Sequence, residues 1–252
     1  MIGEVKKDIG LEEKLLSRDG SMDDVKNLIS SNSKFEELLK FYEDFLSVCK
    51  GDVEEMDILQ GPTTDIVLSP KNILAFLNAT ISFSSYSNYM KVTGKVITNL
   101  LQNSFDAGYN DFLLSNAAED LEFLAVQLQG NSKNHLNLRL EGGVGQVFAG
   151  SAQYINVLAS GGAAEYSCMR SSDCNFTFYQ AVVPVEFASD AEDCIFELYG
   201  GFTGFDKKLT GLYFNPGVNS KDCKYIFNNE HIVNFVKEIL EPENTVRLVD
   251  DY

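Results

Sequence analysis

A short pattern of alternating apolar residues returns about every twenty residues between residues 131 and 200. Four segments align without gaps on their second residues, with steps of 19, 20 and 20 residues, at His135, Tyr154, Cys174 and Cys194. A fixed period of this length is typical of repeat architectures, in which each unit buries its apolar face against its neighbours. The period therefore predicts a stack of windings, each of which carries a β-strand.

The aligned segments also predict which side chains face the interior of the stack. Phe176 and Phe196 stand at equivalent places, and successive side chains of a strand point to opposite faces. We therefore expect both rings to point inward. Thr177 and Glu197, one place further along, should point outward. The segments between the strands align in the same way, at Val147, Ser167 and Phe187.

Two stretches outside the repeat have the apolar spacing of helices. Residues 34–49 follow a capping box formed by Ser33 and Glu36, and Gly51 stands where a C-terminal cap belongs. Their apolar stripe consists of Phe35, Leu38, Leu39, Tyr42, Phe45, Leu46 and Cys49. The stripe at residues 229–240 ends before Pro242 and consists of Ile232, Phe235, Val236, Ile239 and Leu240. Because the end strands of a stack carry unpaired backbone groups, we expect these helices to cover the two ends.

The region between the first helix and the repeat has a weaker pattern. It predicts short strands at residues 65–68 and 79–83, and either a helix or a strand at residues 95–105. The predicted fold class is mainly β, a parallel β-helix (solenoid) of about 20 residues per coil with helical flanks. Three regions result, namely an N-terminal helical segment at 1–60, a β-solenoid at 64–215 with regular coils at 131–200, and a C-terminal helical cap and tail at 216–252.

The charge of the chain argues against direct binding to nucleic acid. The formal net charge of −17 is spread along the sequence, with no basic stripe for phosphate groups. A solvated acidic surface is the simplest interpretation. Met1 to Lys7 are polar and charged, and no apolar run is long enough to span a bilayer. We therefore expect no signal peptide, no membrane contact and a cytoplasmic location.

Five cysteines form no CxxC pair, so the sequence suggests neither a zinc knuckle nor a disulfide framework. Cys174 and Cys194 occupy the same place in successive windings. Stacking would bring their Cα atoms within the range that a disulfide allows, and the redox state is left open. We favour a ladder of reduced, buried thiols, since small soft side chains suit such an interior.

No catalytic, cofactor-binding or metal-binding residue is predicted. The sequence Gly143-Val144-Gly145 invites a dinucleotide-binding interpretation, but Phe148 replaces the third glycine and another strand follows instead of a helix. Neither His135 nor His231 has a metal-ligand neighbour four residues away. No base is placed beside a serine or cysteine nucleophile, and adjacent acids are more simply solvated charge.

The glycine-rich corners carry a family resemblance. Residues 138–145, with the sequence LRLEGGVG, are followed by Ala149 and Gly150, and residues 155–162 repeat the pattern as INVLASGG. This pattern resembles the glycine-punctuated β-helix domain found in the glutamate synthase large subunit and in one of the subunits of formylmethanofuran dehydrogenase. It covers roughly 70 to 90 of the 252 residues and loses its glycines at residues 180–184. The resemblance implies a right-handed parallel β-helix with a structural role and no catalytic residue.

The sequence as a whole predicts a non-catalytic structural or interaction protein that uses the β-solenoid as a scaffold, with self-assembly as an option. One alternative is an accessory subunit of a larger metabolic enzyme complex, and another is an acidic protein that mimics nucleic acid. The expected partner is a protein or a second copy of the chain. The apolar stripe of the N-terminal helices, which Phe41 and Val48 widen, is the predicted contact.

Overall fold

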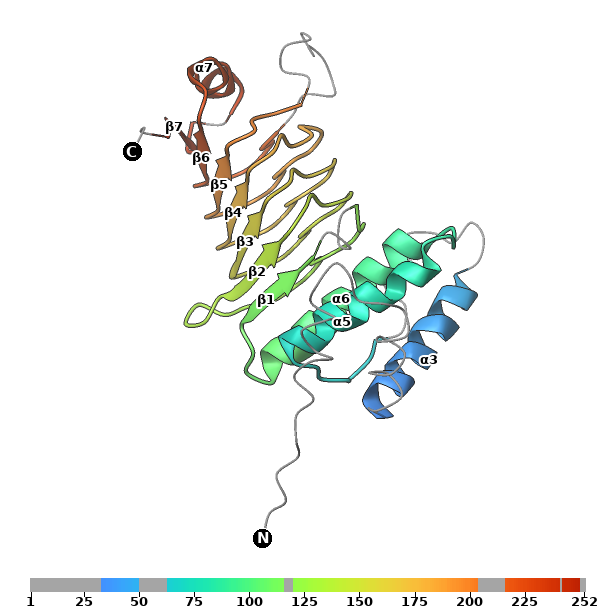
Figure 1. Ribbon diagram of the computed structural model, residues 1–252. Coiled ribbons are helices and arrows are strands. Elements are labelled where there is room, and N and C mark those ends of the chain that lie inside the picture. Colours follow the sequence, from blue (N-terminus) through green and yellow to red (C-terminus); the bar gives the residue numbers. More distant parts are fainter. Residues whose placement is uncertain (1–32, 50–62, 116–119, 204–215, 241, 250–252) are drawn as a thin grey trace.

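The computed structural model describes residues 33–49, 63–115, 120–203, 216–240 and 242–249 (Figure 1). Helices come first in these ranges: α3 (Ser33–Val48), α5 (Pro70–Thr80), the 3-10 helix η1 (Ile81–Phe83) and α6 (Tyr89–Asp106). Strands follow: β1 (Asp111–Leu114), β2 (Leu136–Leu140), β3 (Ile155–Ala159), β4 (Asn175–Phe178), β5 (Ile195–Leu198) and β6 (Lys224–Phe227). The chain then forms α7 (Glu230–Ile239) and β7 (Thr245–Leu248).

The described chain is mixed α and β, which corrects the prediction of a mainly β protein. Its four α-helices have 16, 11, 18 and 10 residues, whereas no strand is longer than five. The predicted strand at residues 65–68 is absent, and Asn103 and Ser104 of α6 bond its backbone instead. The predicted strand at residues 79–83 is absent because the helix that Ser69 caps continues through Thr80 into η1. Residues 95–105 lie within α6.

The seven strands of the described ranges form one parallel sheet in sequence order, β1-β2-β3-β4-β5-β6-β7. The offset between partners is 19 residues from Asn137 to Asn156 and again from Asn156 to Asn175, and 20 residues from Thr177 to Glu197. The predicted alignment placed 20 residues between the second and third segments, and that register is wrong by one residue. The predicted alignment placed Phe176 opposite Asn156, whereas Phe176 lies opposite Val157 in the structure. A slip of one residue matters because successive side chains of a strand point to opposite faces.

Aromatic rings fill the interior behind β4, β5 and β6. Phe176 and Phe196 are both fully buried and stack with ring centroids 5.4 Å apart, which confirms their predicted inward direction. Tyr225 continues the column 5.0 Å from Phe196, and Phe187 meets Phe196 edge-on at 5.4 Å. The outward neighbours Thr177 and Glu197 are half-buried.

We call the chain from the start of one strand to the start of the next a winding. The return segments of successive windings are joined by backbone hydrogen bonds, from Ala149 N to Leu124 O (2.9 Å), from Cys168 N to Phe148 O (2.7 Å) and from Ala188 N to Ser167 O (2.9 Å). Alternate residues there have positive φ, including Ala149 (53°), Cys168 (61°) and Ala188 (57°). Left-handed backbone costs about 1–2 kcal/mol for each such residue, which the winding-to-winding hydrogen bonds offset.

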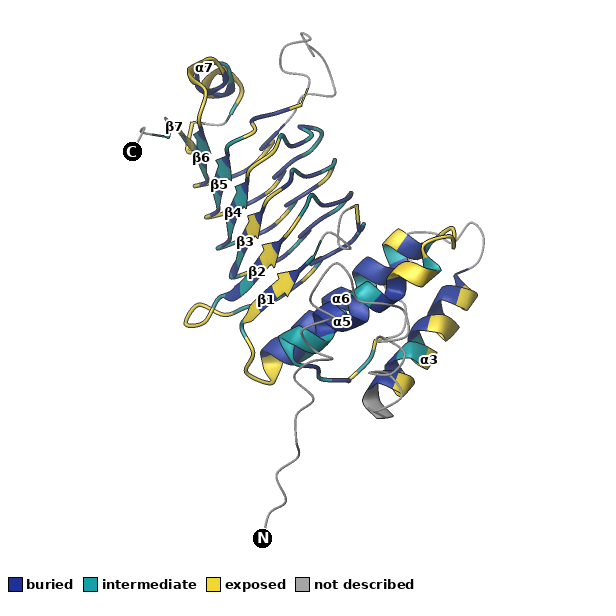
Figure 2. Cartoon of the chain, viewed as in Figure 1, coloured by how far each residue is buried: buried dark blue, intermediate teal, exposed yellow. Residues whose placement is uncertain are grey.

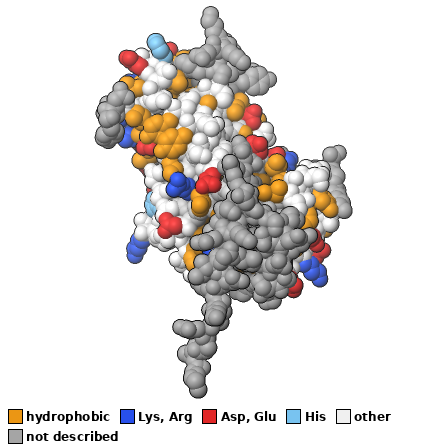
Figure 3. Space-filling model, viewed as in Figure 1, with side chains coloured by type: hydrophobic (Ala, Val, Ile, Leu, Met, Phe, Trp, Pro, Cys, Tyr) orange, Lys and Arg blue, Asp and Glu red, His pale blue; other side chains and the backbone are white. Residues whose placement is uncertain are grey.

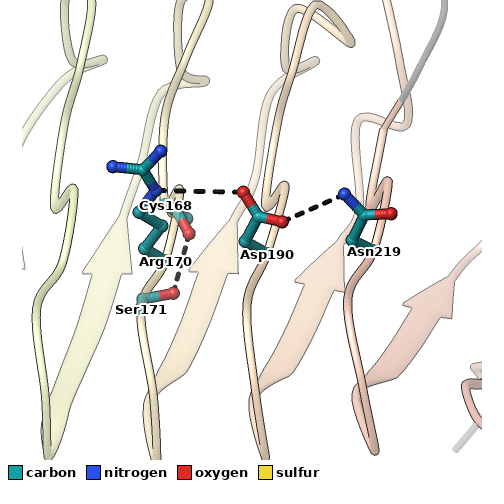
Figure 4. A network of polar contacts seen from close by, with 5 residues as sticks. All are labelled: Cys168, Arg170, Ser171, Asp190 and Asn219. Carbon is teal, nitrogen blue, oxygen red and sulfur yellow. Dashed lines mark hydrogen bonds and ion pairs between the residues drawn. The ribbon is translucent and has the colours of Figure 1, made fainter.

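A polar ladder runs along the outside of these return segments (Figure 4). The Asn219 amide donates to Asp190 Oδ1 at 3.1 Å, and Arg170 Nε lies 3.8 Å from Asp190 Oδ2. Beneath them the Ser171 hydroxyl donates to the carbonyl of Cys168 at 2.8 Å. The ion pair is solvent-exposed and therefore contributes little to stability; the ladder shows that equivalent positions stay aligned over three windings.

Helix α6 covers the first winding and satisfies the backbone at its edge. Thr98 Oγ1 accepts from Ala125 N at 2.8 Å, and the Gln102 side chain both accepts from Gln129 N (2.8 Å) and donates to Gln129 O (3.0 Å). Gly94 lies directly against the Glu122 carbonyl, so closely that a Cβ would overlap it. These side chains pair with the backbone of the segment that follows β1, while α5 packs beside β1 itself at the edge of the sheet.

The stripe of α3 is a packing face within the chain. Its residues Phe35, Leu38, Tyr42, Phe45, Leu46 and Cys49 are buried. The Tyr42 hydroxyl is 2.8 Å from Thr93 Oγ1 in α6, and its ring meets Phe76 of α5 edge-on at 5.7 Å. Phe41 is only half-buried, and Val48 is 80% exposed. The part of α3 that remains open to a partner is therefore its outer surface.

Helix α7 lies at the opposite end of the molecule, beside β6 and β7 (Figure 1). Its buried residues are Ile232, Val233 and Val236, whereas Ile239 of the predicted stripe is 42% exposed. Ile232 lies against Gly201 and Leu240 against Gly217, so the helix covers the return segments. Strands β6 and β7 lie beyond residue 215, where the sequence predicted only a helical cap and tail.

Candidate binding face of the sheet

The outward face of the sheet carries aligned columns of side chains. The first column, read from β1 to β6, consists of Asp111, Asn137, Asn156, Asn175, Ile195 and Lys224. The second column consists of Leu113, Arg139, Leu158, Thr177, Glu197 and Ile226. Exposed residues lie along β1, β2 and β3 (Figure 2). The strands thus present a regular surface on the side opposite to the aromatic core.

Three asparagines and an aspartate form a hydrogen-bonded ladder on this face. Asn175 Nδ2 donates to Asn156 Oδ1 at 2.7 Å, and Asn156 Nδ2 donates to Asn137 Oδ1 at 2.8 Å. Asn137 Nδ2 then donates to Asp111 Oδ1 at 2.8 Å. His135 Nδ1 lies 3.2 Å from Asn156 Oδ1. The ladder holds each amide in a fixed orientation, because a flip would break bonds to the winding on either side.

A shallow groove of about 540 Å³ crosses the first four strands of this face. Its lining consists of Asp111, Phe112, Leu113, Asn137, Leu138, Arg139, Asn156, Val157, Leu158, Asn175 and Thr177. Leu113 and Leu158 are each 38% exposed, so that apolar surface lies beside the amide ladder. Arg139 stands between these leucines in the second column and is also exposed. The groove therefore combines apolar contact, one cation and aligned amides.

The groove offers polar groups that the amide ladder does not use. Each ladder asparagine has a second amide N–H beyond the one used in the ladder, whereas the second lone pair of Asn156 Oδ1 faces His135 Nδ1. Thr177 Oγ1 donates to Glu197 Oε2 at 3.2 Å, and among the residues that the structure describes no third side chain is hydrogen-bonded to this pair. In the described ranges no three His, Cys, Asp or Glu side chains form a group that could hold a metal ion.

The histidines and the glycine motif considered as site candidates occupy structural positions. His135 packs edge-on against Tyr154 at 5.8 Å beside the amide ladder. His231 is exposed in the first turn of α7, where its backbone N–H donates to the cap residue Asn229. Gly145 packs against the backbone of Asp120 and Leu121, where a Cβ would overlap. The structure therefore does not bring the two histidines together, since one precedes β2 and the other lies beyond β6.

Three thiols form a buried column behind the sheet, at Cys174, Cys194 and Cys223. All five cysteines are free thiols in the structure. Contacts with Cys194 and burial raise the pKa of the Cys174 and Cys223 thiols, and Cys194 Sγ itself donates to the Glu192 carbonyl at 3.2 Å. Cys194 Sγ also lies 3.6 Å from Ser171 Oγ. The buried column agrees with the ladder of thiols predicted from the sequence, and their reduced state stays a prediction.

The buried phenol of Tyr225 should make the fold less stable at alkaline pH. Burial raises the pKa of Tyr225, whose hydroxyl donates to Ser220 Oγ at 3.1 Å. The unfolded chain ionises its tyrosines near pH 10, so the contribution of the neutral phenol is present below that pH and is lost as pH rises above it. We expect the urea midpoint to fall between about pH 8 and pH 11, and to fall less in Tyr225→Phe. An equal fall in both proteins would contradict this origin.

The binding face was not singled out from the sequence. The signal that could have found it is the recurrence of asparagine at 137, 156 and 175, with a step of 19 residues. The predicted alignment concealed that recurrence because it placed 20 residues between the second and third windings. Residues 1–32 and 50–60 of the predicted N-terminal segment, including Gly51, lie outside the described residues.

Comparison with known proteins gave no significant match to a family model, to a curated protein or to a solved structure. The resemblance to the glycine-punctuated β-helix domains therefore rests on the sequence motif. Within the described part of the chain, no helix is both long enough and apolar enough to cross a membrane. On the face that Figure 3 shows, acidic and basic side chains are interspersed.

Proposed function

We propose that the chain is a cytoplasmic, non-catalytic scaffold built on a right-handed parallel β-solenoid. Parallel strands in sequence order support this fold, as do the hydrogen bonds between successive return segments. The glycine-rich corners of the family resemblance support the same fold. A stack of this kind presents a rigid side, which suits the binding of another protein.

We further propose that the groove across β1–β4 binds an extended segment of a partner protein. The observation that carries this proposal is the placement of Leu113 and Leu158 beside the Asp111–Asn175 amide ladder. An extended peptide offers N–H and C=O groups to aligned amides, and its apolar side chains can cover the leucines. Docking on a preformed ladder also avoids the entropic cost of ordering loops.

A peptide-display selection on the whole chain tests the groove. Peptides enriched on the parent protein should lose affinity at least about tenfold on Leu158→Asp, because a charge replaces the apolar floor. Tyr166→Asp is the matched control, since Tyr166 is also 38% exposed but lies on a return segment. Peptides that bind both variants equally, or no enrichment at all, would contradict the proposal.

The identity of the partner would also distinguish between the two alternative functions. A metabolic enzyme bound through the groove would favour the accessory-subunit alternative, and a DNA-binding protein would favour nucleic-acid mimicry. On the face shown in Figure 3 the acidic side chains are interspersed with bases, so that face does not favour nucleic-acid mimicry. The partner contact predicted for the N-terminal helices would have to use the outer surface of α3, where Val48 is exposed.

A further inference from the structure

Two tyrosine rings stack on the outward face of the sheet, in a third column beside the two described above. Tyr179 and Tyr199 directly follow β4 and β5, and their ring centroids are 5.1 Å apart with an interplanar angle of 15°. Tyr179 is 52% exposed, so much of this ring is open to solvent. The pair is thus an aromatic surface on the same face as the amide ladder.

The third column places a small residue beside the open side of this stack. Backbone hydrogen bonds continue the strand register into the column: the N–H of Tyr199 donates to a carbonyl of β4 (3.0 Å), that of Tyr179 to β3 (3.1 Å) and that of Ser160 to β2 (3.0 Å). Ser160 is therefore the neighbour of Tyr179 on the β3 side, and Glu141 is the next residue of the column. Both Ser160 and Glu141 are exposed.

The spacing of the column leaves room for one flat group. Neighbouring strands lie about 4.8 Å apart, so the side chains of Tyr179 and Glu141 start about 10 Å apart, with only the short side chain of Ser160 between them. A planar group that stacks on Tyr179 as Tyr199 does would lie over Ser160, with Glu141 on its other side. We call this gap the Ser160 slot. Leu158 of the groove, two residues earlier in β3, borders the slot in the second column.

The outward face around the slot is acidic. Alternate residues of the seven strands were counted, from two positions before the first column through the third column. The acids among them are Asp111, Glu141, Asp173, Asp193, Glu197, Asp222 and Glu243, and the bases are Arg139, Lys224 and Arg247. Seven acids against three bases give a formal charge of −4, and none of the bases lies in the column of the slot. Charge complementarity therefore favours a basic segment on this face.

We propose that the partner segment in the groove is basic and that the Ser160 slot binds one of its arginine side chains. This inference rests on the groove proposed above and adds the residue that the segment must carry. A guanidinium is flat, always charged and weakly hydrated, so it stacks on the Tyr179 ring while its N–H groups donate to the Glu141 carboxylate. A lysine side chain lacks the flat surface, and a phenylalanine side chain lacks the charge.

Short linear peptides enriched by display selection on the full chain are the probe for the slot. They should share an arginine, and its replacement by lysine or phenylalanine should weaken binding at least about tenfold. Tyr179→Leu, which removes the ring, and Ser160→Tyr, which fills the slot, should each weaken binding by about the same factor. Tyr179→Phe keeps the stacking surface and should bind within about threefold of the parent. Tyr166→Leu is the control on a return segment and should bind like the parent.

A double-mutant cycle tests the ionic contact of the arginine. Glu141→Gln should weaken an arginine peptide at least about fivefold and its phenylalanine version by less than about twofold, because only the guanidinium pairs with the carboxylate. Glu230→Gln, in exposed α7, is the control and should weaken neither peptide.

The outcomes separate the slot from the groove. Peptides that lose affinity on Leu158→Asp, but bind Tyr179→Leu and Ser160→Tyr like the parent, would leave the groove in place and overturn the slot. Enriched peptides without a shared arginine, or equal effects of Glu141→Gln on the arginine and phenylalanine peptides, would overturn the choice of arginine. Failure to enrich any peptide would contradict the groove and the slot together.

Discussion

Phe196→Asp should abolish folding of the chain. The Phe196 ring is fully buried between Phe176 and Tyr225, with Phe187 against its edge. An unpaired carboxylate in this place costs several kcal/mol, which is comparable to the roughly 5–15 kcal/mol that stabilise a typical domain. We expect insoluble protein, or a circular dichroism spectrum without a cooperative thermal transition.

The control for this prediction is the next residue along the same strand. Glu197 is half-buried on the outward face, where its carboxylate accepts from Thr177 Oγ1. Glu197→Gln keeps an acceptor oxygen and should shift the melting temperature by only a few degrees, since a substitution of this kind costs about 1 kcal/mol or less. A folded Phe196→Asp protein with an unchanged melting temperature would contradict the register of the windings described above.

Gly94→Ala should separate α6 from the first winding. A Cβ at position 94 would overlap the backbone carbonyl of Glu122, and the helix would have to move away. Movement would break the bonds from Thr98 and Gln102 to the backbone of residues 125 and 129. We expect a loss of about 3 kcal/mol or more in the free energy of unfolding, measured by urea denaturation.

Gly150→Ala is the matched control for this close approach. A Cβ there would find Val147 Cγ1 at 3.6 Å, an ordinary van der Waals contact, and the backbone does not have positive φ. The substitution should change the free energy of unfolding by less than about 1 kcal/mol. Equal losses from the two alanine variants would show that α6 does not rest on the winding as described.

The repeat could be predicted from the sequence because strand side chains alternate strictly. The alternation alone indicates that Phe176 and Phe196 face inward, and the apolar stripe alone locates α7. The predicted register between the second and third segments was wrong by one residue because the segments were aligned on their apolar residues, and such an alignment does not take polar ladders into account. Asn156 and Asn175 share a column that is stabilised by amide hydrogen bonds, which carry no hydrophobic signal.

Helices α5 and α6 could not be assigned from local sequence for a different reason. Residues 79–83 read ATISF, a β-branched and aromatic run that favours a strand, yet helix packing places Ala79 and Thr80 in a buried helical turn. In α6 the polar residues Thr98 and Gln102 lie on the face that touches the winding, so the stripe is less apolar than its burial requires. Whether these segments form helices thus depends on contacts between elements that are far apart in the sequence.

The binding face is tested most directly by photocrosslinking in the cell that makes the chain. A photoreactive amino acid would replace Leu158 in the groove or, in a second variant, Tyr166 on the return segments, which has the same exposed fraction. We expect the Leu158 variant to become covalently linked to one partner protein, and the Tyr166 variant to remain unlinked. Crosslinking of the same partner from Tyr166 and not from Leu158, or from neither position, would contradict the binding face.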